Sequence, residues 1–193
     1  MKPLIHTCSI WVLALAVFPV PCLGKREQPP PDPKFTSIGE IVILPALDFR
    51  ADKEHKAPLK DMRKEARAIL KHKNYAVSES DTTGDVGEIL REDLKTSKPE
   101  WVKRLGPKEA RWVMVLGLGY MDSKLDIGSS GTAQVFGYIY DKETGETVWN
   151  DKTMGRSSAP AGLLGMSMKH LMSGAAVQEA VMNLLFEIPK KGK

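Results

Sequence analysis

The side chains that could do chemistry are few and scattered. The chain has four histidines, His6, His55, His72 and His170. No two of them have the helical spacing of a His-x-x-x-His zinc site. His170 stands beside Lys169, which is typical of a residue that faces water. The sequence therefore predicts no histidine metal centre, and no cofactor.

Asp48 and Arg50 are candidates for catalysis or ligand binding because they follow a continuous apolar run, residues 41–44. In open α/β sheets, ligands bind beyond the carboxyl ends of the strands. A hydrolase that uses Asp48 is therefore one hypothesis. The other, which the sequence favours, is that Asp48 caps a turn or forms a surface ion pair.

Three further motifs each lack a part that their chemistry needs. The glycines of residues 117–119 have no third glycine and no helix after them to hold a phosphate, so a bulge or close packing is expected. The serines of residues 128–131 have no adjacent base and no nucleophile-elbow pattern. The acidic residues of the same region have no calcium-loop spacing: Asp122, Asp126, Asp141 and Glu143. We therefore expect a protein that is not an enzyme.

Residues 1–24 have the order of an export signal. Lys2 precedes an apolar run, and small residues follow that run up to Gly24. The run ends at Val20 and has about half of the roughly 20 residues that a membrane-spanning helix needs. Pro19 and Pro21 would end a helix there. We expect the protein to be exported to the periplasm.

Both cysteines, Cys8 and Cys22, lie within this leader. If Cys22 is lipidated, it anchors the protein to a membrane, and the outer membrane is one candidate for that membrane. If cleavage falls after Gly24 instead, Cys22 is removed. In either case the domain has no free thiol, which excludes disulfides, cysteine-ligated zinc and thiol nucleophiles from it.

The rest of the chain divides into three parts. Residues 25–36 are rich in proline, which favours a semi-rigid spacer of about 3.1 Å per residue. Residues 37–189 are expected to form one domain, and residues 190–193 a basic tail. The formal charge is +4, but basic and acidic residues alternate through 50–110. A nucleic-acid surface usually shows a stripe of one sign, so no nucleic-acid partner is expected.

Apolar periodicity in residues 37–189 predicts the first half of an α/β domain. Continuous apolar runs predict buried strands at 41–44 and 112–116. Apolar residues three and four apart predict a helix from Pro58, ending at a left-handed Asn74, with a short strand at 75–78. Capping patterns at Asp85 and Ser97 predict the starts of two more helices.

The second half is predicted to hold a hairpin and a long helical segment. Residues 133–140 and 147–149 alternate around a glycine turn. Residues 155–162 are predicted to be a loop, and residues 163–186 helical with a candidate break at Ser173 and Gly174. The predicted fold is a single α/β domain. Its mixed, mostly central-parallel sheet carries an antiparallel hairpin, and helices pack on the sheet.

Two groups of side chains are candidate partner surfaces. One is an aromatic row on one strand face, Phe136, Tyr138 and Tyr140. This row is a contact surface if it is uncovered, and core if a helix covers it. The other group is methionines, because methionine adapts to irregular partners: Met166, Met168 and Met172. Their segment is either a core helix or a surface for self-association.

Four motifs, in this order, carry a resemblance to a known superfamily. They are Ile-Val-Ile-Leu-Pro at 41–45, Asn-Tyr-Ala-Val at 74–77, Asp-Lys-Glu-Thr-Gly-Glu-Thr-Val-Trp at 141–149 and Gly-Leu-Leu-Gly at 162–165. Over roughly residues 38–188 the chain resembles bacterial envelope lipoproteins. That superfamily includes the penicillin-binding-protein activator lipoproteins, the periplasmic domain of the curli-secretion lipoprotein, and a neisserial surface lipoprotein family of unknown function, which is the nearest in its motifs.

The resemblance implies a two-layer or three-layer α/β domain that binds envelope proteins and has no catalytic residues to transfer. Pro21 departs from the usual lipidation motif of the superfamily. The expected function is that of a non-enzymatic envelope protein that docks another envelope protein or assembly, or a second copy of itself. The alternative is a soluble periplasmic protein that binds a small ligand in a concave, mostly apolar pocket.

Overall fold

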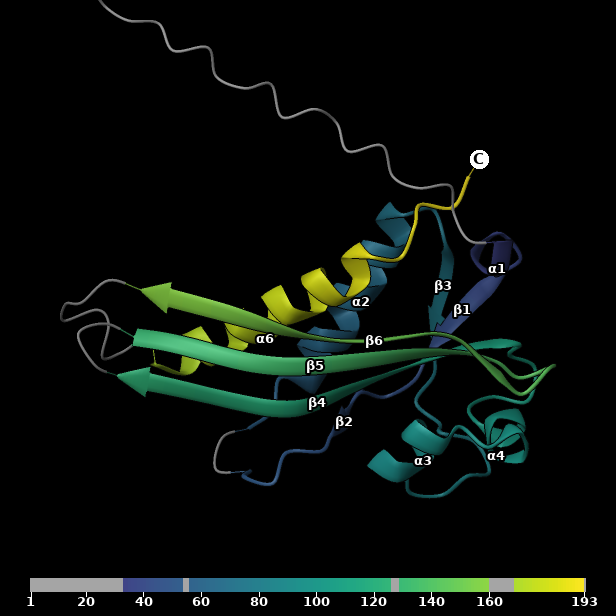
Figure 1. Ribbon diagram of the computed structural model, residues 1–193, viewed down its shortest axis with the longest axis horizontal. Coiled ribbons are helices and arrows are strands. Elements are labelled where there is room, and N and C mark those ends of the chain that lie inside the picture. The colour runs from purple at the N-terminus through teal and green to yellow at the C-terminus, as the bar shows by residue number, and fades with distance from the viewer. Residues whose placement is uncertain (1–32, 54–55, 126–128, 160–168, 193) are drawn as a thin grey trace, which may run out of the picture.

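The computed structural model describes residues 33–53, 56–125, 129–159 and 169–192, and it shows one mixed sheet with helices on both faces (Figure 1). The strands lie in the order β3-β1-β4-β5-β6, and β2 pairs with β4 beside this path. The strands are β1 (Glu40–Ile43), β2 (Leu47–Asp48), β3 (Ala76–Glu79), β4 (Trp112–Leu125), β5 (Ser129–Asp141) and β6 (Glu146–Ala159). The helices are α1 (Pro33–Thr36), α2 (Leu59–His72), α3 (Arg91–Thr96), α4 (Pro99–Arg104) and α6 (Lys169–Phe186).

The parallel part of the sheet forms where the apolar runs predicted it. Strand β1 pairs in parallel with β3 on one side and with β4 on the other. Ile41 and Ile43 are fully buried, and the chain must cross over the sheet to keep these strands parallel. Helix α2 makes the first crossover and ends at Asn74, whose φ of 69° is the left-handed conformation expected there. The predicted mixed α/β domain is confirmed.

The antiparallel part is larger than a single hairpin. Strands β4, β5 and β6 form a long meander, and Gly145 makes the turn between β5 and β6 with a φ of 79°. A bulge lies between Leu118 and Tyr120, beside the glycines where the sequence predicted a bulge or close packing. The prediction of a loop from residue 155 is wrong, because β6 continues to Ala159.

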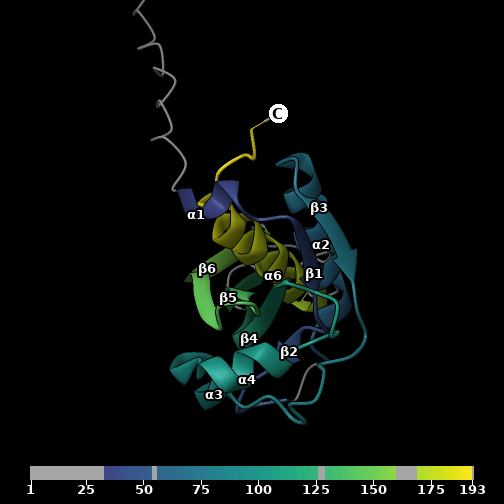
Figure 2. The same ribbon diagram turned by 90° about the vertical axis from the view of Figure 1, so that its right-hand side faces the viewer.

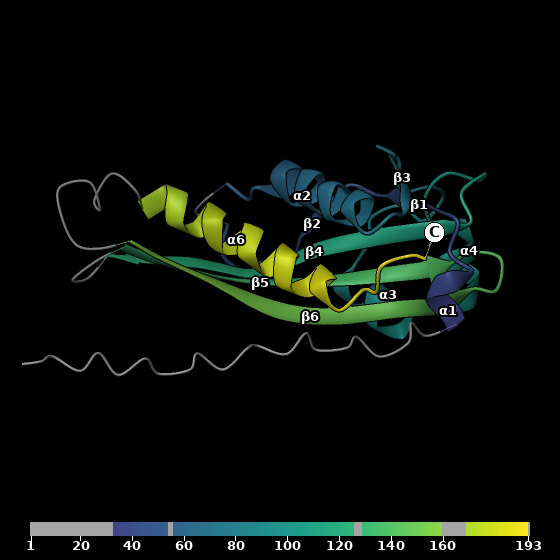
Figure 3. The same cartoon turned by 90° about the horizontal axis from the view of Figure 1, so that it is seen from above.

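The two faces of the sheet are covered differently (Figures 2 and 3). Helices α2 and α6 lie on one face and bury the larger apolar cluster, with α6 packed along β5 and β6. Helices α3 and α4 cover the other face at one end only, where they bury the smaller cluster. The sheet is therefore the middle of three layers at one end. At the other end it has α6 on one face and no helix of the described residues on the opposite face.

Two helix starts differ from those predicted. Helix α3 begins at Arg91 rather than near Asp85, because Gly84 and Gly87 both have positive φ and keep that segment in turns. Its cap is the carboxylate of Asp93, which accepts a hydrogen bond from the Leu90 N–H at 2.9 Å. Ser97 is left-handed and ends α3, so α4 starts after it with Pro99 in the first turn.

Helix α6 runs through Ser173 and Gly174 without the candidate break. Ser173 is buried, so this part of the helix is held against the sheet. No helix in the described part of the chain is long and apolar enough to cross a membrane.

Candidate functional site

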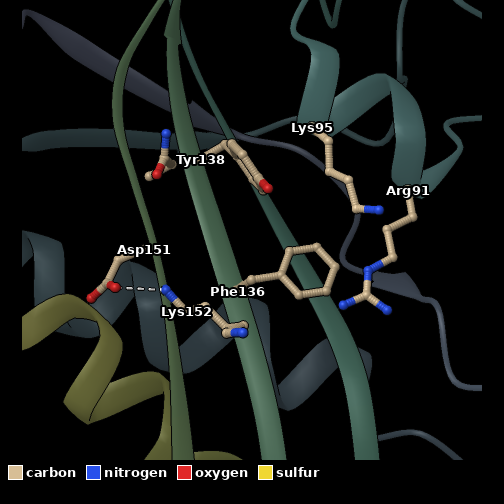
Figure 4. Close-up of a pocket in the computed structure, with 7 residues that line it drawn as sticks. Arg91, Lys95, Phe136, Tyr138, Asp151 and Lys152 are labelled. Atoms are coloured by element: carbon tan, nitrogen blue, oxygen red, sulfur yellow. Dashed lines mark hydrogen bonds between the residues drawn. The ribbon is translucent and has the colours of Figure 1, made fainter.

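A cleft of about 420 Å³ lies between α3 and strands β5 and β6 (Figure 4). Phe136 and Tyr138 of β5 form its aromatic floor. The rest of the lining comes from α3 and β6: Arg91, Lys95, Asn150, Asp151 and Lys152. The cleft exists because α3 spans only six residues and stops covering the sheet before β5 and β6 end.

The aromatic floor belongs to a longer aromatic row beneath α3 and α4. The Tyr138 and Tyr140 rings stack with centroids 5.8 Å apart, and Phe136 meets Tyr138 edge-on at 6.1 Å. Trp101 of α4 packs edge-on against Tyr140 at 5.9 Å. Such pairs are worth about 0.5–1.5 kcal/mol beyond the area that they bury. The row therefore serves as the platform on which the two short helices pack.

This packing buries most of the predicted aromatic partner surface. Phe136 is 4% exposed and Tyr140 is fully buried, so neither forms a contact surface. Burial raises the pKa of the Tyr140 hydroxyl, which receives a hydrogen bond from the Ser97 hydroxyl at 3.3 Å. Tyr138 is half-buried and reaches the cleft. Of the predicted row, Tyr138 is the residue that keeps exposed surface at the cleft, and Phe136 forms the buried floor beneath it.

The cleft is electrically positive. The guanidinium of Arg91 lies over the Phe136 ring at 5.5 Å from its centroid, a cation–π contact that holds it at the rim. Lys95 follows one helical turn later and pairs with Glu92 at 3.2 Å on the exposed surface. Lys152 rises from β6 opposite, and within the described residues neither Arg91 nor Lys152 forms an ion pair.

The one acidic residue of this lining does not neutralise these cations. Asp151 accepts a hydrogen bond from the backbone N–H of Lys152 at 2.7 Å (Figure 4). Its carboxylate thus ties down the edge of β6 and leaves the Lys152 side chain free to meet a ligand. An arginine and a lysine without partners can together bind a carboxylate or a phosphate, and arginine can do so through two parallel N–H donors.

A second hollow of about 270 Å³ adjoins the cleft, and Arg91 lines both. Leu47, Phe49 and Ile89 contribute apolar surface to this hollow, and Leu90 beside it is 56% exposed. Phe49 packs on Phe136 with ring centroids 5.6 Å apart, so the aromatic floor continues from one hollow to the other. Asp48 and Glu88 also line this hollow, so the surface on that side of Arg91 is partly apolar and partly acidic.

Beyond the cleft, the face of the sheet that no helix of the described residues covers carries polar side chains together with two exposed apolar ones. Tyr120 is 45% exposed and Met154 is 43% exposed, and both oppose Gln134 in the sheet register. The glycine with the close approach is Gly117, where a Cβ atom would lie 2.2 Å from Cε2 of the Phe136 ring. We call this region the open sheet face and define it by Tyr120, Asp122, Gln134, Met154 and Arg156.

Asp48 and Arg50 form an ion pair, as the favoured alternative in the sequence predicted. Both carboxylate oxygens of Asp48 accept hydrogen bonds from the Arg50 guanidinium at 2.8 Å. The Arg50 guanidinium holds the pKa of the Asp48 carboxyl below its ordinary value. A general base works best with a pKa near the working pH, and the pairing with Arg50 moves the pKa of Asp48 away from it.

The other motifs take structural positions where the structure describes them. Asp141 accepts hydrogen bonds from the Arg111 guanidinium at 2.9 and 3.2 Å and from the Glu143 N–H, so it orders the β5–β6 turn. Met172 is half-buried, and its carbonyl receives a hydrogen bond from Ser157. Met166 and Met168 lie outside the described residues, as does Asp126. No group of three or more potential metal ligands occurs in the described ranges.

Sequence reasoning missed the three cations of the cleft. Arg91 and Lys95 stand four residues apart, which places them on one face of a helix, and that signal was available. Lys152 is distant in the chain, and acidic residues follow or precede each of the three in sequence. Only the packing of α3 over β5 and β6 brings these three cations together around one cleft.

Solved structures of other proteins resemble the fold of this chain in part. No family model matches the chain, and no curated protein matches its sequence closely enough to be a relative. The structure of lipoprotein GNA1162 from Neisseria meningitidis is 18% identical, covers 72% of this chain and 99% of its own, and has a TM-score of 0.47. A PelC dodecamer from Paraburkholderia phytofirmans is 12% identical, covers 83% and 93% respectively, and also scores 0.47.

A third structure, the hypothetical protein CT253 from Chlamydia trachomatis, is 13% identical. It covers 78% of this chain and 95% of its own, with a TM-score of 0.48. Several of the similar structures are bacterial lipoproteins by name. At these identities and TM-scores the likeness carries no conclusion about activity or partners, and membership of the superfamily expected from the sequence motifs stays a prediction.

Proposed function

We propose that the chain is a non-enzymatic protein of the bacterial envelope that docks an acidic segment of another envelope protein in the cleft. The observation that carries the proposal is a pair of cations on either side of an aromatic floor, Arg91 and Lys152, neither of which forms an ion pair among the described residues. Arginine and tyrosine are favoured at protein interfaces, and charge complementarity sets which partners bind. The export signal of residues 1–24 supports a partner outside the cytoplasm.

The surroundings of the cleft favour a polypeptide over a small molecule. Exposed Leu90 lies at one end and exposed Met154 lies on the open sheet face at the other. An extended segment that crosses the cleft would place a carboxylate between Arg91 and Lys152 and apolar side chains on either side. A small anion would leave both apolar regions in water. The size of the cleft does fit a small ligand, since ligand pockets hold about 300–1,000 Å³, and this is the second candidate.

Cross-linking in cells distinguishes these two functions. A photo-reactive residue in place of Lys95, which is exposed at the rim, is expected to yield covalent adducts with an envelope protein. The cross-linked peptide, identified by mass spectrometry, is expected to contain aspartate or glutamate. The matched control is the same residue in place of Lys64, which is exposed on α2.

Equal adducts at positions 95 and 64 would contradict docking at the cleft. A chain that yields no adduct at position 95, but whose thermal unfolding midpoint rises with a soluble aromatic carboxylate, would favour the small-ligand function instead.

We further propose that Cys22 holds the protein at a membrane, with the proline-rich residues 25–36 as a spacer. The mass of the mature protein is then expected to correspond to a chain that begins at an acylated Cys22. A mature chain that begins at Lys25 would overturn the anchor and leave the docking proposal unaffected, because docking requires only the domain.

A further inference from the structure

Helix α6 has two apolar faces, and the sheet covers only one of them. Val177, Ala180 and Leu184 point to the sheet and are buried. On the opposite side, Leu171 is 61% exposed, Met182 is 50% exposed and Phe186 is 67% exposed, with half-buried Ala175 between them. We call these four residues the outer stripe of α6. Exposed Gln178 lies on the same side, so the outer stripe consists of two apolar pairs with a polar residue between them. Apolar side chains that gather on an exposed surface are typical of a contact site.

Helix α2, on the same face of the sheet, shows what a solvated outer surface looks like in this protein. Its buried residues are Met62, Ala66 and Leu70, and its exposed positions include Lys60, Lys64 and Arg67. The two helices pack against each other, so they meet the same solvent. The outer stripe of α6 has no charged side chain of its own, and the Lys73 ammonium lies beside it, 5.7 Å from the centroid of the Phe186 ring.

The spacing within the outer stripe is symmetric. Leu171 and Ala175 are four residues apart, as are Met182 and Phe186, and the two pairs flank a midpoint between Gln178 and Glu179. In an antiparallel pair of α6 helices with a twofold axis at that midpoint, Leu171 faces Phe186 of the other copy. Ala175 faces Met182 of the other copy, so a small residue receives a long one. This self-complementarity is what a twofold interface between identical chains requires.

Charge near the axis does not oppose this arrangement. The side chain of Glu179 turns down to the edge of the sheet, where its Oε2 accepts a hydrogen bond from the Arg156 N–H at 2.9 Å. That bond, together with the Asp151 bond to the Lys152 N–H, also occupies two donors of the free β6 edge. Edge strands are commonly blocked in this way, so a second copy would meet the helix and not the strand.

We propose that the outer stripe of α6 is the contact between two copies of this chain, paired antiparallel about the Gln178–Glu179 midpoint. The 18 residues of the helix give a contact about 27 Å long, from a rise of about 1.5 Å per residue. A strip of that length and about one helix wide buries less than the roughly 800 Å² per partner of a standard interface. The dimer is accordingly weak, and it forms at high local concentration such as that of molecules held on a membrane.

Disulfide trapping tests the pairing and its register. Two versions of the mature chain, with Cys22→Ser to remove the native thiol, carry Ala175→Cys and Met182→Cys respectively. A mixture of the two is expected to form the mixed disulfide at least tenfold faster than either version forms its own disulfide, because only residues 175 and 182 oppose each other. Equal rates for all three pairings would overturn the proposed register.

Sedimentation of the same mature chain tests the dimer itself. A concentration-dependent dimer is expected, and Met182→Lys is expected to raise its dissociation constant at least tenfold. The matched control is Asn183→Lys, which adds the same charge one position away, off the stripe. A chain that stays monomeric at millimolar concentration, or whose Met182→Lys variant instead loses binding to phosphatidylglycerol vesicles, would show that a second copy is not the occupant. Neither result bears on the cleft.

Discussion

Replacement of Gly155 with alanine is expected to lower the free energy of unfolding by about 3 kcal/mol, the upper part of the usual range for an overpacked core. Gly155 lies in β6 directly under α6. A Cβ atom there would lie 2.0 Å from the carbonyl oxygen of Ala176 and 2.4 Å from the backbone nitrogen of Ala180. Both atoms belong to the helix backbone, so no side chain can turn aside to make room. The helix must move off the sheet.

The matched control is another glycine of the same contact region, Gly174 of α6. A Cβ atom at that position meets nothing within 4 Å. Because glycine within a helix costs about 1 kcal/mol relative to alanine, Gly174→Ala is expected to raise the free energy of unfolding by about 0.5–1 kcal/mol. Chemical denaturation of both variants measures these changes. A Gly155→Ala protein as stable as the parent would mean that α6 does not lie this close to β6.

Gly155 also explains where sequence reasoning about the fold failed. Residues 154–159 are Met-Gly-Arg-Ser-Ser-Ala, a composition typical of loops. The strand persists because its small residues let α6 approach, as Gly131 does on β5, where a Cβ atom would lie 2.3 Å from the Met172 carbonyl oxygen. Small residues that serve close packing and small residues that serve a turn look alike in one sequence. Tertiary contact decides between them.

Periodicity was a sufficient guide wherever one face of an element is buried and the pattern is long. The helix α2, the buried strand β1 and the alternation of β5 follow from it, and so does the placement of Tyr140 and Ile139 on opposite faces of β5. The sequence offers two starts for α3, one at the capping pattern of Asp85 and Glu88, and one just before Arg91, where Asp93 in the first turn caps the Leu90 N–H. The positive φ angles of Gly84 and Gly87 select the second.

The candidate site could not be predicted to the same extent. The aromatic row was found from the sequence. Whether the row faced solvent depended on how helices α3 and α4 pack on the sheet, and the sequence does not reveal that packing. The cleft arises where the Arg91 end of α3 lies over Phe136. Its cations come from segments that are about 60 residues apart in the chain. A site of this kind is set by the length of a short helix on a longer sheet, and that difference appears only once the layers are assembled.

Reversal of both unpartnered charges of the cleft, Arg91→Glu together with Lys152→Glu, is expected to weaken binding of an acidic peptide by about 30-fold. Each reversal exchanges an attraction of about 0.5 kcal/mol at the exposed surface for a repulsion of about the same size. The two reversals together therefore cost about 2 kcal/mol, which corresponds to that factor. The probe is a ten-residue peptide that alternates glutamate with phenylalanine and serine, with binding measured by fluorescence polarisation. Because both cations are exposed, the affinity of the parent protein is also expected to fall as salt is raised.

The matched control is Lys60→Glu together with Lys64→Glu on α2. Both lysines are exposed, neither forms an ion pair among the described residues, and the double variant changes the net charge by the same amount. If the cleft is the site, this control is expected to weaken binding less than threefold, since it alters only the long-range field. Equal losses in the two double variants would mean that the peptide responds to the overall positive charge of the domain. In that case Arg91 and Lys152 would have no special role, and docking at the cleft would be wrong.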